Sequence, residues 1–308
     1  MRASSPVPAT HIEFQGQSLL RLGDDDHFIL VAPRHGGRLL RWVRRGRELL
    51  YWPHDADWSR AAKIRGGNPL LFPFIGRHFV DGEPGAWRDA DGRRYALPAH
   101  GFARERPFSA EVDADGRSVT LRLVATDATR AAYPFAFVFE VRYRLHADAL
   151  EATLVVENRD ARPLPYYAGH HFYFALPHAA RASTTLSLPT NERRAQRADG
   201  TLTEPEPGER RYALDDPRLQ DRFHVLRDAG RALLDGGARG PRVAIELDGA
   251  PGAPWYAITT WSETPTSDFY CVEPWLGLPN AIAHGVGLRR LAPGAREAAT
   301  CRLIDLRP

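Results

Sequence analysis

Apolar and polar residues alternate with a period of two along most of this chain, and this pattern constrains the fold more than any other feature. Within residues 134–145, Phe137, Phe139, Val141 and Tyr143 fall on one face, and charged residues fall on the other. Such alternation is typical of an antiparallel strand with one face in the core and one face in water. Further strands are expected over the following ranges: 28–33, 38–43, 118–126, 149–157, 243–247, 256–260, 268–273 and 298–305.

Turn signals are frequent, and helical segments are scarce. The chain contains 26 glycines and 25 prolines, which interrupt regular structure at short intervals. Many short strands separated in this way predict an all-β fold, a large antiparallel β-sandwich with few short helices. All-β domains of this length occur, so residues 1–308 are expected to form a single domain. Residues 1–24 are an N-terminal segment expected to be flexible at its start, and the polar stretch 189–218 is expected to be a long surface excursion.

The charge balance and the hydropathy exclude several classes of protein. A net charge of +3 without a clustered basic stripe does not indicate a nucleic-acid-binding protein. No apolar run reaches the ~20 residues of a membrane span, and the first residues lack the apolar core of a signal peptide. We therefore expect a cytoplasmic protein with no membrane or nucleic-acid partner, either a monomer or a homodimer. The densest basic run is expected on the solvated face of a hairpin, with an anion or phosphate contact as the alternative. That run consists of Arg38, Arg41, Arg44, Arg45 and Arg47.

Several catalytic chemistries lack their usual residues. Lys63 is the one lysine, so a Schiff-base or phosphate-loop enzyme would depend on it, and residues 61–67 lack Walker spacing. The sequence has no GxSxG elbow, and no GxGxxG opens a helix after a strand. The two cysteines, Cys271 and Cys301, lie in apolar, strand-like segments and are expected to be buried thiols.

Three polar residues in otherwise apolar segments are the strongest candidates for chemistry: His100, His171 and Glu273. A carboxylate next to proline and tryptophan is costly to bury without a partner, and imidazoles can be that partner. A carboxylate and an imidazole are the groups that general acid–base catalysis uses near neutral pH. His170 and His171 are adjacent, so in an extended chain they point to opposite sides, and at most one of them faces a given site.

Two further hypotheses concern the binding of a metal ion and of an anion. His100, His171 and Glu273 are also residue types that bind zinc or iron, but no HxH, HExxH or CxxC spacing supports this, so we expect no metal. Arg77 ends the apolar run of residues 66–76. Its guanidinium is expected to donate to hydroxyls or to an anion in a cleft, and the alternative is a plain surface charge.

Four motifs occur in order along the chain: residues 67–73 (GNPLLFP) with the Gly-Arg pair at 76–77, residues 100–104 (HGFAR), residues 169–174 (GHHFYF) and residues 273–277 (EPWLG). Together, on an all-β background, they resemble the aldose 1-epimerase (galactose mutarotase-like) family over roughly residues 25–305. The residues of these motifs most resemble those of the bacterial branch that includes glucose-6-phosphate 1-epimerases. The resemblance implies a galactose mutarotase-like supersandwich of antiparallel strands, with the sugar in an open cleft.

The resemblance also implies a role for each candidate residue. His171 matches the histidine of the family's Gly-x-His-Pro-x-Phe motif and would be the general acid at the ring oxygen, although Phe172 replaces the proline. Glu273 would be the general base at the anomeric hydroxyl, and His100 would hydrogen-bond the sugar near its ring oxygen. The expected substrate-binding residues are Arg77, Asp221, Asn68, Trp275 and Arg104.

The expected reaction uses no cofactor. A proton reaches the ring oxygen as the C1 hydroxyl loses one, the C1–C2 bond rotates, and the ring closes on the other face; one acid and one base are expected on opposite sides of the sugar. Trp275 and Trp42 are candidate platforms for the ring. The predicted function is an aldose 1-epimerase, an isomerase of hexoses. The alternatives are a hexose phosphate substrate, with Arg65 and Arg104 converging near Arg77, and a non-catalytic carbohydrate-binding protein.

Overall fold

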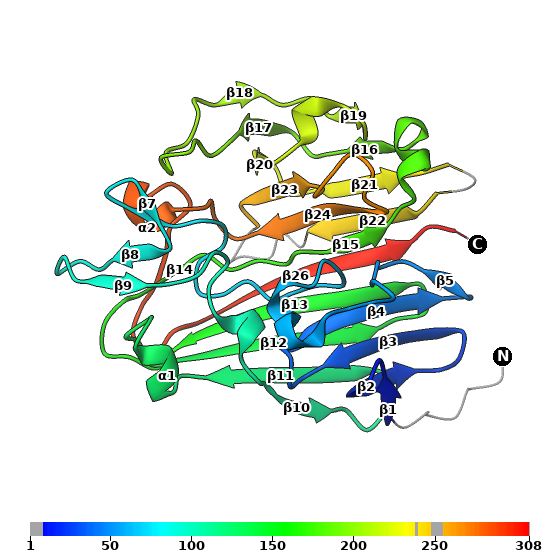
Figure 1. Ribbon diagram of the computed structural model, residues 1–308, viewed down its shortest axis with the longest axis horizontal. Helices are drawn as coiled ribbons and strands as arrows, with labels where there is room; N and C mark the ends of the chain where they lie inside the picture. Colours follow the sequence, from blue (N-terminus) through cyan, green and yellow to red (C-terminus); the bar gives the residue numbers. More distant parts are fainter. Residues whose placement is uncertain (1–8, 238–239, 248–254, 308) are drawn as a thin grey trace.

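The computed structural model describes residues 9–237, 240–247 and 255–307, and a nine-stranded antiparallel sheet is its largest element (Figure 1). The sheet's central strand is β26, which pairs with β13 on one side and β22 on the other. From edge to edge its strands are β10 (Ser109–Val112), β11 (Ser118–Val124), β12 (Phe137–Leu145), β13 (Ala149–Asn158), β26 (Arg296–Asp305), β22 (Arg242–Leu247), β21 (Arg231–Asp235), β16 (Thr185–Ser187) and β19 (Arg211–Ala213).

A second layer is built from two smaller antiparallel sheets. The five-stranded sheet contains, in order, β1 (Thr10–Phe14), β2 (Gln17–Gly23), β3 (His27–Ala32), β4 (Arg38–Arg44) and β5 (Arg47–Glu48). The six-stranded sheet contains, in order, β15 (Tyr173–Ala175), β24 (Phe269–Trp275), β23 (Ala257–Trp261), β20 (Arg222–Leu226), β17 (Asn191–Arg194) and β18 (Glu206–Pro207).

Isolated bridges join these two sheets through the motif-bearing segments. Leu50 bridges to Phe174 within β15, and Leu71 bridges to Gly169. Phe72 bridges to Gly101, so the first and second motifs lie side by side. Smaller antiparallel pairs are formed by β6 (Phe79–Val80) with β7 (Glu83–Pro84), β8 (Ala86–Arg88) with β9 (Arg94–Ala96), and β14 (Leu164–Tyr166) with β25 (Arg289–Leu291).

The main hydrophobic core lies between the two layers. Phe72 of the first motif stacks on Phe139 of β12, with ring centroids 4.4 Å apart and planes 7° apart. The same core takes in Ile29 of the five-stranded sheet and Val272 of the six-stranded sheet, all without solvent exposure. Close packing of side chains from three sheets therefore fixes the motif-bearing segments in place.

Helices are few and short among the described residues, as the sequence predicts. The two α-helices are α1 (Asp127–Arg130) and α2 (Ala281–His284), and the 3-10 turns are η1 (Trp58–Lys63), η2 (Ala103–Glu105), η3 (His178–Ser183) and η4 (Pro217–Leu219). No helix in the described ranges is long and apolar enough to span a membrane.

The predicted strands are confirmed within one or two residues at most ends, and the predicted all-β fold with few short helices is confirmed. In β12 the core-facing residues are those expected from the alternation. The N-terminal segment contains β1 and β2; the start expected to be flexible, residues 1–8, lies outside the described residues. The buried thiols of Cys271 and Cys301 are also confirmed.

The prediction that the basic run lies on the solvated face of a hairpin is only partly correct. Both faces of β4 are covered by protein, so its alternation does not separate core from water. Arg44 is 7% exposed and pairs with Asp305 at 2.9 Å, and Arg38 is 4% exposed and donates to the backbone oxygen of Ala61. The arginines of this run that remain half-buried or exposed include Arg41, which pairs with Glu48.

Candidate active site

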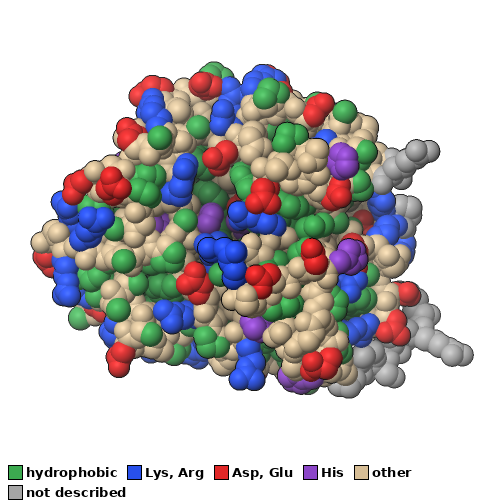
Figure 2. All heavy atoms as spheres, viewed as in Figure 1, with side chains coloured by type: hydrophobic (Ala, Val, Ile, Leu, Met, Phe, Trp, Pro, Cys, Tyr) green, Lys and Arg blue, Asp and Glu red, His purple; other side chains and the backbone are tan. Residues whose placement is uncertain are grey.

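A cavity of about 520 Å³ lies on the six-stranded sheet, where the motif-bearing segments cross it. Figure 2 shows this face hollowed near its centre, with Lys, Arg and His side chains gathered at the opening. Its volume is within the range that holds small-molecule ligands. Apart from Asn68 and the candidate platform Trp42, the predicted site residues line this cavity: Arg77, His100, Arg104, His171, Asp221, Glu273 and Trp275.

Glu273 projects from β24 into the floor of the cavity. Its residue is 1% exposed, and its backbone is held opposite Thr259 of β23. The indole Nε1 of Trp275 donates to carboxylate Oε2 at 3.2 Å. Burial raises the pKa of the Glu273 carboxyl well above its usual range; the hydrogen bond from Trp275 opposes this, and the charge of Asp221 adds to it.

His171 reaches the same point from the segment just before β15. Its Nδ1 lies 3.3 Å from Oε1 of Glu273, without the alignment of a hydrogen bond. Burial lowers the pKa of the His171 imidazole well below its usual range, and the guanidinium groups of Arg104, Arg65 and Arg38 lower it further. Because burial penalises both charges, the pair favours a single proton held on the carboxyl.

Asn68 positions the two adjacent histidines. Its Oδ1 accepts from the backbone N–H of His171 at 2.7 Å, and its Nδ2 lies 2.9 Å from Nδ1 of His170 and 2.8 Å from the hydroxyl of Tyr143. Asn68 has no solvent exposure and does not line the cavity. The expectation that Asn68 binds substrate is therefore wrong, because protein groups take up its amide.

His170 and His171 face opposite sides, as expected for an extended chain. His170 is fully buried and stacks on Phe172, with ring centroids 4.8 Å apart. His171 stacks on Tyr173 at 4.6 Å and points its edge at Trp261. His171 is therefore the one of the two that lines the cavity.

His100 sits on a strained turn beside this pair. Its φ is +67°, a left-handed conformation that is uncommon for residues other than glycine. The turn is held by two bonds with Gly76: the His100 N–H donates to the Gly76 oxygen at 2.8 Å, and the Gly76 N–H donates to Nδ1 of His100 at 3.2 Å. Because Nδ1 accepts, the neutral ring carries its proton on Nε2 and is a donor. The His100 and His171 ring centroids are 5.5 Å apart.

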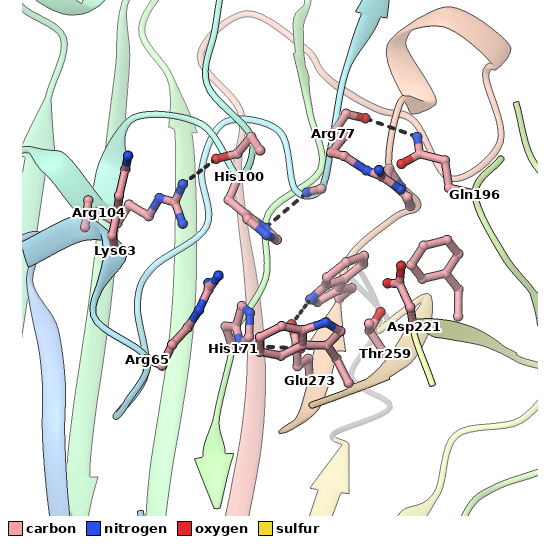
Figure 3. A pocket seen from close by; sticks show the side chains of 17 residues that line it. Lys63, Arg65, Arg77, His100, Arg104, His171, Gln196, Asp221, Thr259 and Glu273 are labelled. Atoms are coloured by element: carbon pink, nitrogen blue, oxygen red, sulfur yellow. Dashed lines mark hydrogen bonds and ion pairs between the residues drawn. The ribbon is translucent and has the colours of Figure 1, made fainter. Parts of the chain in front are cut away.

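Arg77 and Asp221 lie on one side of the cavity, as Figure 3 shows. Asp221 has a φ of +52° at the start of β20, while Asp215 and Asp216 line a different cavity. Trp275 stacks on Phe223 at 5.6 Å and offers an aromatic wall. The second predicted platform, Trp42, is wrong: it is fully buried in the core and donates to His27.

Cationic side chains gather on the other side of the cavity, across from Arg77 (Figure 3). Arg104 donates to the backbone oxygen of Ala99 at 2.9 Å, and Arg65 pairs with Glu263 at 3.1 Å. Lys63, at the end of η1, lines the same side. Lys63 was noted in the sequence only as the one lysine, and no motif signal placed it at the site.

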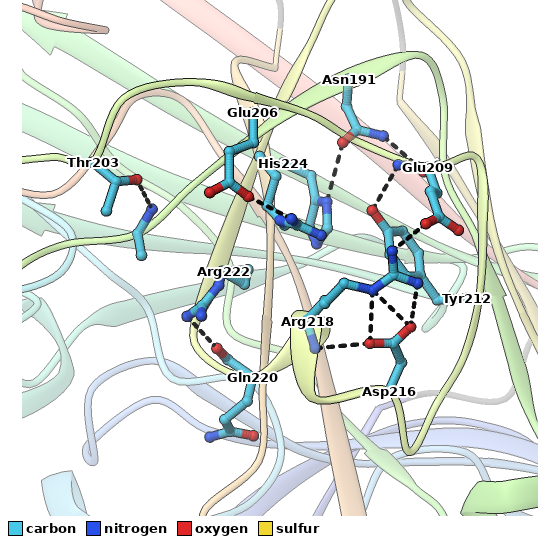
Figure 4. Close-up of polar contacts among 12 residues, drawn as sticks. Asn191, Thr203, Glu206, Glu209, Tyr212, Asp216, Arg218, Gln220, Arg222 and His224 are labelled. Atoms are coloured by element: carbon cyan, nitrogen blue, oxygen red, sulfur yellow. Dashed lines mark hydrogen bonds and ion pairs between the residues drawn. The ribbon is translucent and has the colours of Figure 1, made fainter.

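Gln196 also lines the cavity, and it comes from the stretch expected to be a surface excursion. That expectation is wrong in part, because the stretch contributes β17, β18 and β19 to both layers. Figure 4 shows its polar contacts, among them Asn191 Oδ1 at 3.2 Å from Nδ1 of His224 and Arg218 paired with Asp216 at 2.7 Å. Trp261 is another lining residue that lay outside the recognised motifs.

The arrangement brings a carboxyl and an imidazole together in an open cavity rimmed by hydrogen-bond donors. The fold places the chain in the class of galactose mutarotase-like β-sandwich proteins. Solved structures agree on the fold. A Synechocystis protein superposes with a TM-score of 0.80 at 24% identity, covering 99% of this chain and 98% of that one. A galactose mutarotase related enzyme from Lactobacillus acidophilus gives 0.77 at 22% identity, covering 94% and 97%.

The sequence match identifies the family. A family model described as aldose 1-epimerase matches residues 18–283, so the chain belongs to the aldose 1-epimerase family. An Escherichia coli protein named "Putative glucose-6-phosphate 1-epimerase" is 32% identical over 114 residues, which is 36% of this chain and 34% of that protein. The match thus spans about a third of that relative's length. A protein of the same name from Cenchrus ciliaris is 24% identical over 268 residues, covering 78% and 72%.

Proposed function

We propose that this protein is an aldose 1-epimerase that interconverts the α and β anomers of a hexose. The observation that carries the proposal is the placement of His171 Nδ1 at 3.3 Å from Glu273 Oε1, at the floor of a cavity large enough for a sugar. Such a pair can move one proton onto a substrate and take another from it. Family membership supports the same activity.

The proposed reaction passes one proton through the pair. The single proton of the pair, which rests on the Glu273 carboxyl, first passes to His171 across their 3.3 Å separation. The imidazolium then donates this proton to the ring oxygen O5 while Glu273 takes the proton from the C1 hydroxyl; the C1–O5 bond breaks and the aldehyde forms. After rotation about C1–C2, Glu273 returns its proton to the aldehyde oxygen as O5 attacks C1 and releases its proton to His171. The net proton count is unchanged.

The spacing of the pair differs from the expectation of groups on opposite sides of the sugar. At 3.3 Å, His171 and Glu273 are neighbours. This spacing still suits the reaction, since O5 and the anomeric oxygen are bonded to the same carbon. His100 would donate to a sugar oxygen near O5, Arg77 and Asp221 would bind hydroxyls, and Trp275 would pack against the ring. None of these proposed steps needs a metal or an organic cofactor.

A hexose phosphate is the second candidate substrate. The observation that favours it is the group of Lys63, Arg65 and Arg104 on one side of the cavity, since phosphate is bound by such cations. The names of the Escherichia coli and Cenchrus ciliaris relatives point the same way. Arg65 is partly neutralised by Glu263, so the hexose and the hexose phosphate are to be compared directly.

The test follows the anomerisation of freshly dissolved α-D-glucose, α-D-galactose and glucose 6-phosphate, with the spontaneous rate subtracted. The wild-type protein is expected to accelerate at least one of these sugars. Glu273→Gln removes the base while keeping the shape of the side chain, and we expect it to lower kcat by ~10²–10⁴-fold. The relative kcat/KM values identify the substrate class.

Glu140→Gln is the matched control, because Glu140 lies on β12 and its ion pairs are with Arg122 and Arg296, away from the cavity. It should retain the wild-type rate. If the wild type binds sugar but accelerates none of the three, the protein is a carbohydrate-binding protein. If Glu273→Gln keeps full activity, the carboxylate is not the base.

A further inference from the structure

Three side chains with metal-ligand chemistry meet at the base of the cavity: His171 and Glu273 line it, and the fully buried Cys271 lies beside them. One imidazole nitrogen, the thiol Sγ and one carboxylate oxygen all lie within 4.8 Å of one another. The three residues are 6%, 0% and 1% exposed. Thiolate, imidazole and carboxylate are the three ligand types that proteins use for Zn²⁺. His100, which the sequence made a possible ligand, is not part of this group.

Strand register explains why they meet. β15 and β24 are antiparallel, with Tyr173 opposite Cys271, and the bridge between Gly169 and Trp275 continues the same register. His171 is midway between Gly169 and Tyr173, which places it opposite Glu273. Cys271 and Glu273 are two residues apart on β24, so their side chains leave the same face. Two of the three ligands therefore lie on β24, and pairing on both sides of His171 fixes the third against them.

The ligand atoms are free to bind. Nδ1 of His171 is buried and has no hydrogen bond to any described residue. Trp275 holds Oε2 of Glu273, which leaves Oε1 facing His171. His171 and Glu273 also line the open cavity, so an ion can approach them from solvent.

We propose that His171, Cys271 and Glu273 form a binding site for Zn²⁺ or a similar thiophilic divalent cation, and that the bound ion blocks the epimerase reaction. The blocking part rests on the proposed function, because the metal would occupy the imidazole lone pair and the carboxylate oxygen that move the proton. The cavity side leaves room for a fourth ligand, such as water.

Charge and proton balance set the conditions for binding. The ion displaces the thiol proton of Cys271 and the proton shared by His171 and Glu273, so two protons leave and the thiolate and carboxylate neutralise the 2+ charge. Affinity should therefore rise with pH. The positive charges of the nearby Arg65 and Arg104 side chains oppose binding of the cation.

The first test measures binding without using activity. Full-length protein is stripped with a chelator, kept reduced, and titrated with Co²⁺, whose thiolate-to-metal absorption reports a sulfur ligand; Zn²⁺ is then used to displace it. We expect one equivalent of Co²⁺ with the thiolate band in the wild type and in Cys301→Ser. Cys301 is an equally buried thiol on β26, outside the triad. Cys271→Ser and Cys271→Ala should lack the band.

The second test measures the anomerisation rate with and without Zn²⁺, each protein being compared with its own metal-free rate. Wild type and Cys301→Ser should lose at least tenfold in rate at a Zn²⁺ concentration that changes the rate of the Cys271 variants less than twofold. Absence of a thiolate band in the wild type would overturn the site, even if the Cys271 variants fail to fold. A thiolate band in the wild type without any loss of anomerisation rate on adding Zn²⁺ would overturn the proposal that the ion blocks the reaction, but not the metal site. An inactive wild type that shows the band would refute the proposed function and leave the metal site standing.

Discussion

The protonation of His171 and Glu273 depends on their shared burial more than on either residue alone. Moving charge into a site with little solvent disfavours imidazolium and carboxylate alike, so their pKa values move in opposite directions. Two groups this close titrate as a unit. Over the range between the lowered and the raised pKa, the pair carries one proton, which is the number that the proposed reaction needs.

The pH dependence of activity follows from this. We expect kcat/KM of the wild type to stay flat as the pH crosses ~6.5, the ordinary imidazole value. It should fall at lower pH, where the pair gains a second proton, and at higher pH, where Glu273 loses its proton. The measurement is a pH–rate profile corrected for spontaneous anomerisation. An acid limb centred at the ordinary imidazole value would contradict this account of the pair.

Asn68 offers a separate test of how the pair is positioned. Asn68→Ala removes the acceptor for the His171 N–H and the donor for Tyr143, and we expect it to lower the free energy of unfolding by about 2–4 kcal/mol. It should also lower kcat, because the His171 backbone loses its anchor. Urea unfolding and the anomerisation assay measure the two effects.

Asn158→Ala is the matched control for Asn68. Asn158 is equally buried, and its amide donates to the backbone oxygens of Arg162 and Leu291 away from the cavity. The control should lose similar stability but keep kcat in the folded protein. Equal losses of kcat in both variants would show that Asn68 has no positioning role.

Sequence reasoning found the residues that belong to motifs and missed those that do not. His100, His171 and Glu273 were found because polar groups in apolar segments are conspicuous. Gln196 and Trp261 come from segments with no such contrast, and their place at the cavity depends on how distant strands pair. For Asn68 the motif was right but the role was wrong, because a motif does not say which way an amide points.

Among the structural elements, the turn that carries His100 is tightly constrained. Gly101 has a φ of +74°, and a Cβ at this position would lie 2.1 Å from the backbone oxygen of Phe72. That oxygen accepts from the N–H groups of Phe102 and Ala103, so it cannot move freely. The turn therefore needs glycine for both its conformation and its close approach to the first motif.

Gly101→Ala should therefore destabilise the protein by ~3 kcal/mol or more, through strain and the clash together. Gly46 is the control: its φ of +69° is similar, but nothing lies within 4 Å of an added Cβ. Gly46→Ala should cost only ~1 kcal/mol. Chemical unfolding measures both, and equal losses would show that the contact with Phe72 is not restrictive. In Gly101→Ala the displaced His100 should also raise KM.

Strand positions were predictable at this scale wherever one face of a strand meets water. β12 alternates cleanly and was predicted nearly to its ends. β4 is covered by protein on both faces, so the prediction that its arginines lie on a solvated face was only partly correct. The short strands β17, β18 and β19 were missed, because strands of two to four residues carry too few positions to show a period.

For the whole molecule, the two-layer all-β architecture was predictable from the alternation, but the pairing of strands was not. The register that sets His171 against Glu273 arises from contacts between segments about a hundred residues apart. The 3.3 Å spacing of the pair could therefore be read only from the folded chain.

Buried neutral histidines make the stability of the whole molecule sensitive to acid. Burial lowers the pKa of His78 to about 4 and the pKa values of His170 and His224 to about 3. Between ~6.5 and these values the unfolded chain binds protons that the native state does not. The free energy of unfolding is therefore unaffected by these histidines above pH ~6.5 and decreases as the pH falls below it. His78 alone lowers it by at most ~3 kcal/mol.

We thus expect the free energy of unfolding to drop between pH 7 and pH 5, as urea titrations can show. His78→Gln should make the drop smaller by the contribution of one proton, while exposed His54→Gln serves as the control. A free energy of unfolding that rises on acidification through this range would contradict the prediction.

The position of β26 has a consequence for how the chain folds during synthesis. This strand occupies the middle of the nine-stranded sheet, yet it follows all the other strands of that sheet in chain order. The ribosome delivers the two halves of the sheet, β10–β13 and β16, β19, β21 and β22, well before residues 296–305, so until then the two halves have unpaired edges where they will later join. Such edges are sites of mispairing between chains. The nascent protein should therefore depend most on chaperones just before β26 emerges.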